Sequence, residues 1–242
     1  MRFLPPLLAL VALSACGGGD AAGNATTATP VAGVAAPAGK PWTETVAVTP
    51  EGGYRIGNPD AAIKLVEYGS RTCPTCGAFA REGNEPLIAN YVSTGKVSFE
   101  FRDFAVHGAP DLAAAVLGRC NGTATFFPLL EAMYQDQLAT LDRMQAIPQA
   151  EQARLQSIPP VQAIAGWADA AGFVDFVKQR GVPEAKAREC LRDQKLIDQV
   201  VKITEEGGAT VTGTPTFLIN GEKVENAVQW KDIEAALKGA GA

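Results

Sequence analysis

Two cysteines separated by two residues are the part of this sequence best suited to chemistry. Cys73 and Cys76 stand in the run Cys-Pro-Thr-Cys, shortly after an apolar and β-branched run from Ile63 to Tyr68. That run predicts a strand, and the apolar pattern after the cysteines predicts a helix of about 20 residues that stops at Gly95. We therefore expect the pair at the first turn of a helix that directly follows a buried strand.

A cysteine at the N-terminus of a helix is expected to have a lowered thiol pKa. Free backbone N–H groups and the positive end of the helix dipole stabilise the thiolate of Cys73 there. Cys76 lies one turn further on the same helical face, with the two Cβ atoms about 5 to 6 Å apart, so a small relaxation gives disulfide geometry. Pro74 suits this first turn, because no N–H donor is needed there. The pair is predicted to form a redox-active disulfide, Cys73–Cys76.

Zinc binding, an inert structural disulfide and chance are the alternative interpretations of this pair. Zinc usually takes four ligands, whereas the chain has a single histidine, His107, and no second Cys-x-x-Cys. A disulfide across one helical turn closes too short a loop to stabilise the fold much. The residues therefore favour redox chemistry, with no metal and no organic cofactor. His107 falls in a predicted loop and is expected to be a surface or capping residue.

The N-terminal residues have the features of an export signal. Arg2 supplies a positive charge, and the apolar stretch from Leu4 to Leu13 is too short to span a bilayer. The stretch ends in Leu-Ser-Ala-Cys at Cys16, which resembles the lipobox of bacterial lipoproteins. This resemblance implies a signal peptide over residues 1–15 and lipidation of Cys16, which would anchor the protein to a membrane at the periplasmic face of the cell envelope. The alternative is an ordinary secretory signal peptide.

The composition changes twice after Cys16. Residues 16–44 have few bulky apolar side chains and are predicted to be a flexible tether. The chain as a whole is 47% hydrophobic, and the residues after the tether are numerous enough for one domain with an insertion. A formal net charge of -5 argues against binding of nucleic acid.

Strand patterns fall on both sides of a long helical region. Strands are predicted at Thr45 to Val48, Tyr54 to Ile56, Val97 to Phe104, Thr216 to Ile219 and Lys223 to Glu225, before a last helix at Trp230 to Leu237. Between them, helices are predicted at Asp111 to Arg119, Thr125 to Leu138, Val161 to Gln179, Pro183 to Arg192 and Lys195 to Glu206. We therefore expect one domain over residues 45–109 and 203–242, with a helical insertion over 110–202.

The insertion carries two isolated cysteines, Cys120 and Cys190. In an exported protein, adjacent thiols oxidise, so we predict a structural disulfide between them. Two buried free thiols are the alternative.

Three segments together resemble the DsbA-like branch of the thioredoxin superfamily. They are EYGSRTCPTC (Glu67 to Cys76), TGKVSFEFRDF (Thr94 to Phe104) and VTGTPTFLING (Val211 to Gly221). The resemblance extends from about Tyr54 to the C-terminus and implies an α/β thioredoxin-like fold with an inserted helical domain.

The resemblance also implies roles for three further residues. Pro215 would be cis and lie against the cysteine pair, and the Thr214 backbone would pair with an extended substrate peptide. Glu67, six residues before Cys73, stands where the superfamily has a buried acid. Glu67 is in strand phase with an apolar face, where its pKa should rise and where it could exchange protons with Cys76 through water. The alternative for Glu67 is a carboxylate that faces solvent on an edge strand.

The function that the resemblance implies is thiol-disulfide exchange in the bacterial cell envelope. The protein would introduce disulfides into exported polypeptides and, as an oxidase, would pass electrons to a quinone-linked membrane partner; we expect a monomer. Thr75 occupies a position where strongly oxidising relatives often have histidine, so the direction of the reaction is open. A periplasmic disulfide reductase or isomerase is the alternative, and a chaperone-like peptide-binding lipoprotein is the alternative from another class.

Overall fold

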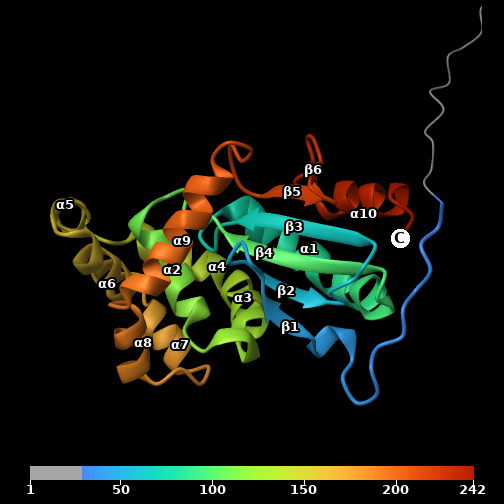
Figure 1. The fold of residues 1–242 in the computed structure, drawn as a ribbon. Helices are drawn as coiled ribbons and strands as arrows, with labels where there is room; N and C mark the ends of the chain where they lie inside the picture. The colour runs from blue at the N-terminus through green and yellow to red at the C-terminus, as the bar shows by residue number, and fades with distance from the viewer. Residues whose placement is uncertain (1–28) are drawn as a thin grey trace, which may run out of the picture.

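A six-stranded mixed sheet forms the centre of the molecule (Figure 1). The computed structural model describes residues 29–242; the predicted signal peptide, Cys16 and the first part of the predicted tether lie outside the described residues. The strands are β1 (Val46–Val48), β2 (Tyr54–Gly57), β3 (Ile63–Gly69), β4 (Val97–Asp103), β5 (Thr216–Ile219) and β6 (Glu222–Lys223), in the order β1-β2-β4-β3-β5-β6. Within residues 29–242, no helix is long and apolar enough to cross a membrane.

The parallel pair β3 and β4 lies at the middle of the sheet, and each of the other pairings is antiparallel. Helix α1 (Pro74–Asn90) connects β3 to β4, and Gly95, with a φ of 73°, ends the short helical turn that follows it. A parallel connection requires such a crossover, as the sequence predicts. The carboxyl ends of β3 and β4 therefore lie side by side, at the edge where α1 begins.

One face of the sheet is covered by α1, by α3 (Phe126–Gln135) and by the C-terminal helix α10 (Trp230–Gly239). Alternate residues of β3 point toward these helices, because side chains alternate along a strand. Ile63, Leu65 and Glu67 are buried on this face, and Lys64 is exposed on the other. The other face is covered only at one end, where Ile203 of α9 (Gln194–Gly207) packs near Tyr68.

The inserted helices form a second apolar core beside the sheet (Figure 1). They are α2 (Ala109–Arg119), α3, α4 (Gln137–Gln145), α5 (Gln149–Ser157), α6 (Pro160–Ala170), α7 (Phe173–Lys178), α8 (Glu184–Cys190) and α9. Helix α3 contributes to both cores: Phe126 and Tyr134 pack against the sheet, and Leu129 and Met133 pack against the other inserted helices. The insertion is therefore joined to the sheet by shared packing as well as by its two chain connections.

The helix boundaries correct three sequence-based predictions. The helix predicted over Thr125 to Leu138 is two helices, separated at Asp136, and the helix predicted over Val161 to Gln179 is also two, separated at Gly172. Gly172 has a φ of 77°, which a continuous right-handed helix does not allow. Helix α5 was not predicted. Because Leu155 is its one buried residue, α5 lacks the apolar stripe on which the prediction depends.

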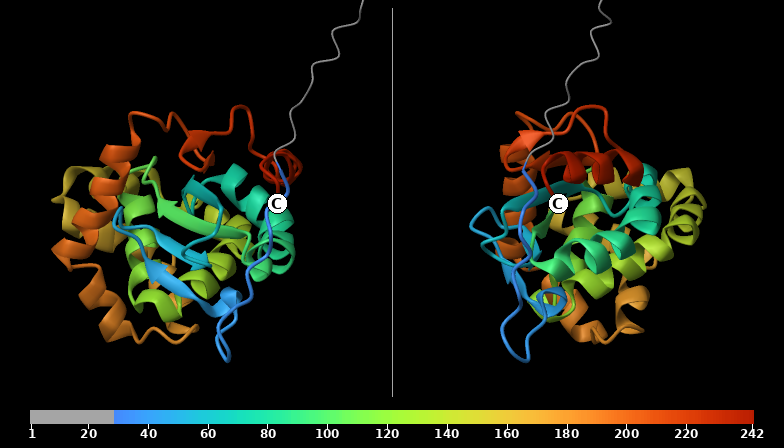
Figure 2. Two further views of the ribbon diagram at one scale, coloured as in Figure 1. Left: turned by 45° about the vertical axis from the view of Figure 1, so that its right-hand side comes forward. Right: turned by 90° about the vertical axis from the view of Figure 1, so that its right-hand side faces the viewer.

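The part of the predicted tether nearest the domain lies against it. Val31 and Val34 donate backbone hydrogen bonds to the carbonyls of Gly241 and Thr94, and Trp42 is buried. Figure 2 shows this segment, in blue, passing beside the C-terminus. Apolar side chains explain the difference from a free coil, because this stretch contains the tryptophan that the rest of the tether lacks.

Cys120 and Cys190, at the ends of α2 and α8, are joined in a disulfide. The bond links two inserted helices that are 70 residues apart in the sequence. Removing a covalent link of this kind typically costs a few kcal/mol, because it limits the unfolded chain.

A buried carboxylate with two guanidinium partners connects the sheet to the insertion. Asp103, the last residue of β4, accepts hydrogen bonds of 2.8 Å from the Nε atoms of Arg71 and Arg119. Arg71 precedes α1, and Arg119 is at the end of α2. All three side chains are almost fully buried. Loss of the carboxylate would leave two buried cations without their counter-ion.

We predict that Asp103→Ala lowers the free energy of unfolding by about 3 to 5 kcal/mol, because it leaves both guanidinium groups uncompensated. Denaturant unfolding of the purified variant measures this. The matched control is Asp169→Ala, which removes an exposed carboxylate paired with Arg188 and should cost less than about 1 kcal/mol. Equal, small losses in both variants would show that the Asp103 network does not hold the two parts together.

Candidate active site

Cys73 and Cys76 lie where the sequence predicts, at the junction of β3 and α1. Cys73 is the N-cap residue of α1, Pro74 is in its first turn, and Cys76 is one turn further along. Both sulfur atoms are thiols in this structure, and both residues are buried, with Cys73 7% and Cys76 0% exposed. A partner molecule therefore reaches Cys73 first.

The two thiols have opposite pKa shifts. Hydrogen bonds from the Cys76 thiol, then from Thr214 and from the backbone N–H groups of Cys76 and Thr75, lower the pKa of Cys73 to about 5, although burial alone would raise it. Burial, together with the hydrogen bond to Cys73 and the charges of Glu67 and Cys73, raises the pKa of Cys76 well above its ordinary value. At neutral pH the pair therefore holds one proton, on Cys76.

Glu67 lies in β3, on the sheet face that α1 covers. It is 2% exposed, and its Oε1 atom has no hydrogen-bond partner within the described residues. Burial, and after it the negative charges of Cys73 and Asp103, raises the pKa of Glu67 well above its ordinary value. Gly69 leaves room for the carboxyl group, since a Cβ at Gly69 would lie 2.8 Å from Oε1. Glu67 is therefore a buried acid that holds its proton more tightly than an ordinary glutamic acid does.

The Thr214–Pro215 peptide bond is cis and precedes β5 directly. Because β5 pairs with β3, with Thr216 opposite Tyr68, this turn lies beside the loop that carries the cysteines. The Cys73 Sγ atom is 3.2 Å from the Thr214 carbonyl oxygen, to which the thiol donates when it is protonated. Proline has no N–H group, so no backbone donor stands at this position of the turn.

The insertion holds the loop before α1 in place. The Gln137 side-chain amide of α4 donates to the carbonyls of Cys73, at 2.8 Å, and Arg71, at 3.1 Å. The Tyr134 hydroxyl of α3 donates to the Ser70 carbonyl at 3.2 Å. Gly77 in α1 permits this approach, because a Cβ there would overlap with the Gln137 side chain. The position of Cys73 thus depends on side chains from two inserted helices.

A polar cluster next to Cys73 contains the single histidine. The Thr72 hydroxyl contacts His107 Nδ1 at 3.1 Å and donates to the buried Asp111 carboxylate, which also accepts the His107 backbone N–H at 2.8 Å. The hydrogen bond to Asp111 is the main cause that raises the pKa of His107, and the charge of Cys73 adds to it. His107 is thus part of the surroundings of the active-site loop; the N-cap residue of α2 is Gly108, and no side chain of the described residues caps this helix.

The sequence profile of the thioredoxin family, described as "Thioredoxin", matches residues 49–239. The chain belongs to this family, and its fold is the thioredoxin-like fold with an inserted helical domain.

Solved structures of DsbA-like and protein-disulfide isomerase proteins share this fold. The crystal structure of a protein-disulfide isomerase from Novosphingobium aromaticivorans is 28% identical and has a TM-score of 0.72 over 76% of this chain and 94% of that one. Wolbachia pipientis alpha-DsbA1 is 20% identical, with a TM-score of 0.59 over 76% of this chain and 87% of its own.

A relative from Rickettsia bellii, named as a protein-disulfide oxidoreductase, is 27% identical over 77% of this chain. The chain spans 65% of the length of that relative.

Sequence reasoning missed the supports of the site. Arg71, Asp103 and Gln137 were not singled out, and Tyr134 fell within a predicted helix with no role at the site assigned to it. One signal was present for Asp103: an acidic residue at the end of a predicted buried strand needs a cationic partner. The sequence does not show which of its arginines supplies that partner.

We predict that the Cys73 thiolate, followed by its ultraviolet absorbance or by rapid alkylation, titrates with a midpoint near 5. Two variants test the cause. Cys76→Ser keeps a hydrogen-bond donor, so the midpoint should stay low, whereas Cys76→Ala removes the largest stabilising contact, so the midpoint should rise. Once the pKa of Cys73 exceeds 6, each further unit of rise lowers the thiolate fraction at pH 6 by up to about tenfold. Equal midpoints in Ser and Ala variants would contradict the role of this hydrogen bond.

Proposed function

We propose that this protein is a thiol-disulfide oxidoreductase that introduces disulfides into exported polypeptides. The observation that carries the proposal is the opposite pKa shift of the two thiols, to about 5 for Cys73 and well above the ordinary value for Cys76. A thiol of low pKa is the better leaving group in an exchange reaction. The low pKa of Cys73 therefore favours the step in which Cys73 leaves and the newly formed substrate disulfide is released.

The reaction begins with the Cys73–Cys76 disulfide. A substrate thiolate attacks Cys73 Sγ, a mixed disulfide forms, and Cys76 leaves with the electron pair of the broken bond. The second substrate thiolate then attacks the substrate sulfur of the mixed disulfide, and Cys73 leaves as a thiolate. The substrate loses two electrons as its disulfide forms, and the enzyme gains them as the dithiol.

Glu67 is the proposed proton donor to Cys76. The Cys76 sulfur leaves as a thiolate in a buried site, where charge is costly. A protonated Glu67 can supply the proton through a water molecule, and it recovers one when the disulfide is regenerated. The raised pKa of both groups supports this role, since each binds a proton more tightly than an ordinary group of its kind.

Thr214 and Pro215 are the proposed substrate-binding residues. They border a hollow of about 270 Å³ whose opposite side is formed by residues 223–228. Thr214 is partly exposed and its carbonyl is next to Cys73 Sγ, so an extended peptide that pairs with this backbone would bring its cysteine to the thiol.

We predict that Cys76→Ser captures substrates as mixed disulfides on Cys73, because the variant lacks the thiol that resolves them. Non-reducing gels of cells that express the variant should show adducts that dithiothreitol removes. Cys73→Ser is the matched control and should give none. Adducts in the Cys73→Ser variant would reverse the two roles.

The direction of the reaction is proposed to be oxidation. Whatever stabilises the Cys73 thiolate stabilises the dithiol form and makes the disulfide a stronger oxidant. Thr75 is exposed and supplies a backbone N–H but no charge, so we expect a reduction potential in the oxidising half of the range from about -270 to -120 mV. A disulfide reductase or isomerase is the second candidate, and the similarity to the Novosphingobium protein-disulfide isomerase favours it.

We predict that selective reduction of Cys73–Cys76 raises the melting temperature at pH 7. The folded pKa of about 5 lies below the ordinary value of 9.0, so the thiolate contribution is present in full above 9 and is lost as the pH falls through 5. The difference in melting temperature between the two forms should therefore shrink from pH 7 to pH 5. A lower melting temperature on reduction at pH 7 would favour the reductase.

Anchoring through a lipid on Cys16 is proposed from the lipobox-like sequence. A quinone-linked membrane protein that reoxidises the pair is proposed from the resemblance to DsbA-like proteins. We predict that Cys16→Ser moves the protein from the membrane fraction to the soluble fraction, measured by fractionation and blotting. The control is Ser14→Ala, which keeps the cysteine and should remain with the membrane. A wild-type protein found in the soluble fraction would contradict the anchor.

A further inference from the structure

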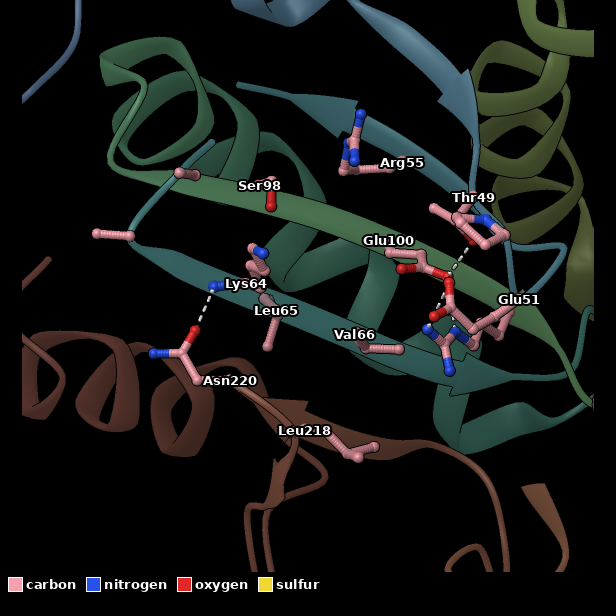
Figure 3. Close-up of a pocket in the computed structure, with 15 residues that line it drawn as sticks. Thr49, Glu51, Arg55, Lys64, Leu65, Val66, Ser98, Glu100, Leu218 and Asn220 are labelled. Carbon is pink, nitrogen blue, oxygen red and sulfur yellow. Dashed lines mark hydrogen bonds and ion pairs between the residues drawn. The ribbon is translucent and has the colours of Figure 1, made fainter. Parts of the chain in front are cut away.

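A hollow of about 660 Å³ lies over the sheet face that α9 leaves open. Its walls come from β2, β4, β3 and the end of β5, and Figure 3 shows the side chains that line it. Glu67 points to the opposite face of the sheet, so none of the groups assigned to thiol chemistry lines this hollow. The hollow is therefore a separate feature of the molecule.

At one end of the hollow two carboxylates share one guanidinium group. Glu100 accepts hydrogen bonds from Arg102 Nε at 2.6 Å and from the Thr49 hydroxyl at 2.8 Å. Glu51 lies 3.7 Å from the same arginine. The Oε1 atom of Glu100 is thus held within the fold, and Arg102 offsets part of the negative charge at this end.

The other end holds donors that lack acceptors. Arg55 Nε is shielded from solvent and has no hydrogen-bond partner within residues 29–242. The Ser98 hydroxyl makes no hydrogen bond with the described part of the chain, and Ser98 lines the hollow. Neither Arg55 nor Lys64 forms an ion pair with any described carboxylate. Unsatisfied buried donors cost free energy, and a bound acceptor removes that cost.

Strand pairing brings these three residues together. Lys64 of β3 is directly opposite Ser98 of β4, and Gly57 of β2 is opposite Ser98 on its other side. Arg55 is two residues before Gly57, on the same sheet face, so it is the diagonal neighbour of Ser98. In Figure 3 the Ser98 hydroxyl lies between Arg55 and Lys64.

We propose that Arg55, Ser98 and Lys64 form a binding site for a phosphate group. Two cations and one hydroxyl provide donors on three neighbouring strands, and a phosphate has oxygens enough to accept from all three. Glu100, the cross-strand neighbour of Arg55, pairs its Oε1 atom with Arg102, which reduces its repulsion of an anion at this place. Val66 and Leu218 give the hollow an apolar border, which also suits the glycerol part of a phospholipid headgroup.

The test is a titration of the full chain with inorganic phosphate, observed by ¹⁵N–¹H NMR. The Arg55 Nε–H signal and the Lys64 and Ser98 amide signals should shift and saturate. Sodium chloride at equal ionic strength should not reproduce the shifts. Loss of one charge-assisted hydrogen bond corresponds to about tenfold in affinity, so Arg55→Gln should weaken binding by at least that factor and Ser98→Ala by severalfold.

Lys231→Ala, at an exposed lysine outside the hollow, is the control and should bind phosphate as the wild type does. Ser98→Ala removes an unpaired hydroxyl, so this variant should fold normally. It can still test the proposal if Arg55→Gln does not fold. The proposal is overturned if the wild type shows no saturable shift, if chloride gives the same shifts, or if all variants bind equally. A competition experiment with monomeric short-chain phosphatidylglycerol then identifies the source of the phosphate group. If the lipid occupies the site at a lower concentration than inorganic phosphate does, the ligand is a lipid headgroup; if it needs a higher concentration, the ligand is free phosphate.

Discussion

The structure depends most on one buried carboxylate, that of Asp103. It is the shared acceptor for two arginines that come from opposite sides, Arg71 from the loop before the cysteines and Arg119 from the first inserted helix. The two guanidinium groups also lie over the ring of Phe126, at 5.0 and 5.9 Å, so the same aromatic side chain of α3 borders both. An ion group of this kind is costly to bury and even more costly to break, because each charge needs the others. It therefore fixes the geometry between sheet, loop and insertion more strictly than apolar packing alone would.

This constraint explains why the inserted helices matter for thiol chemistry. The backbone carbonyls of the loop that carries Cys73 accept hydrogen bonds from Gln137 and Tyr134 of the insertion. Those bonds hold Cys73 at the N-cap of α1, where its sulfur receives donors from the first helical turn. A change in the packing of α3 or α4 would move the loop and change the thiol pKa without touching either cysteine. The insertion is thus part of the machinery that sets the properties of the pair.

Local sequence patterns predicted most of the fold, but the sequence did not show which distant residues contact one another. The strand from Ile63, the helix after Cys73 and the return strand at Thr216 follow from periodicity and from turn residues, which act over a few positions. Helix α5 could not be found in this way because it buries little, and the division at Gly172 depends on one backbone angle. The Asp103 group and the Gln137 contacts join residues 16 to 66 positions apart. Several arginines could equally have been partners of Asp103, so the sequence alone does not select among them.

The proton arrangement of the site follows from which groups are kept from water. Cys73, Cys76 and Glu67 share one small buried region, and two negative charges there would repel strongly. The helix N-terminus and the hydrogen bonds around Cys73 assign the single favoured charge to that sulfur, so the other two groups keep their protons. When Cys73 enters a disulfide its charge disappears, and with it one of the causes that raise the pKa of Glu67, the largest being burial. The pKa of Glu67 is therefore coupled to the redox state of the pair.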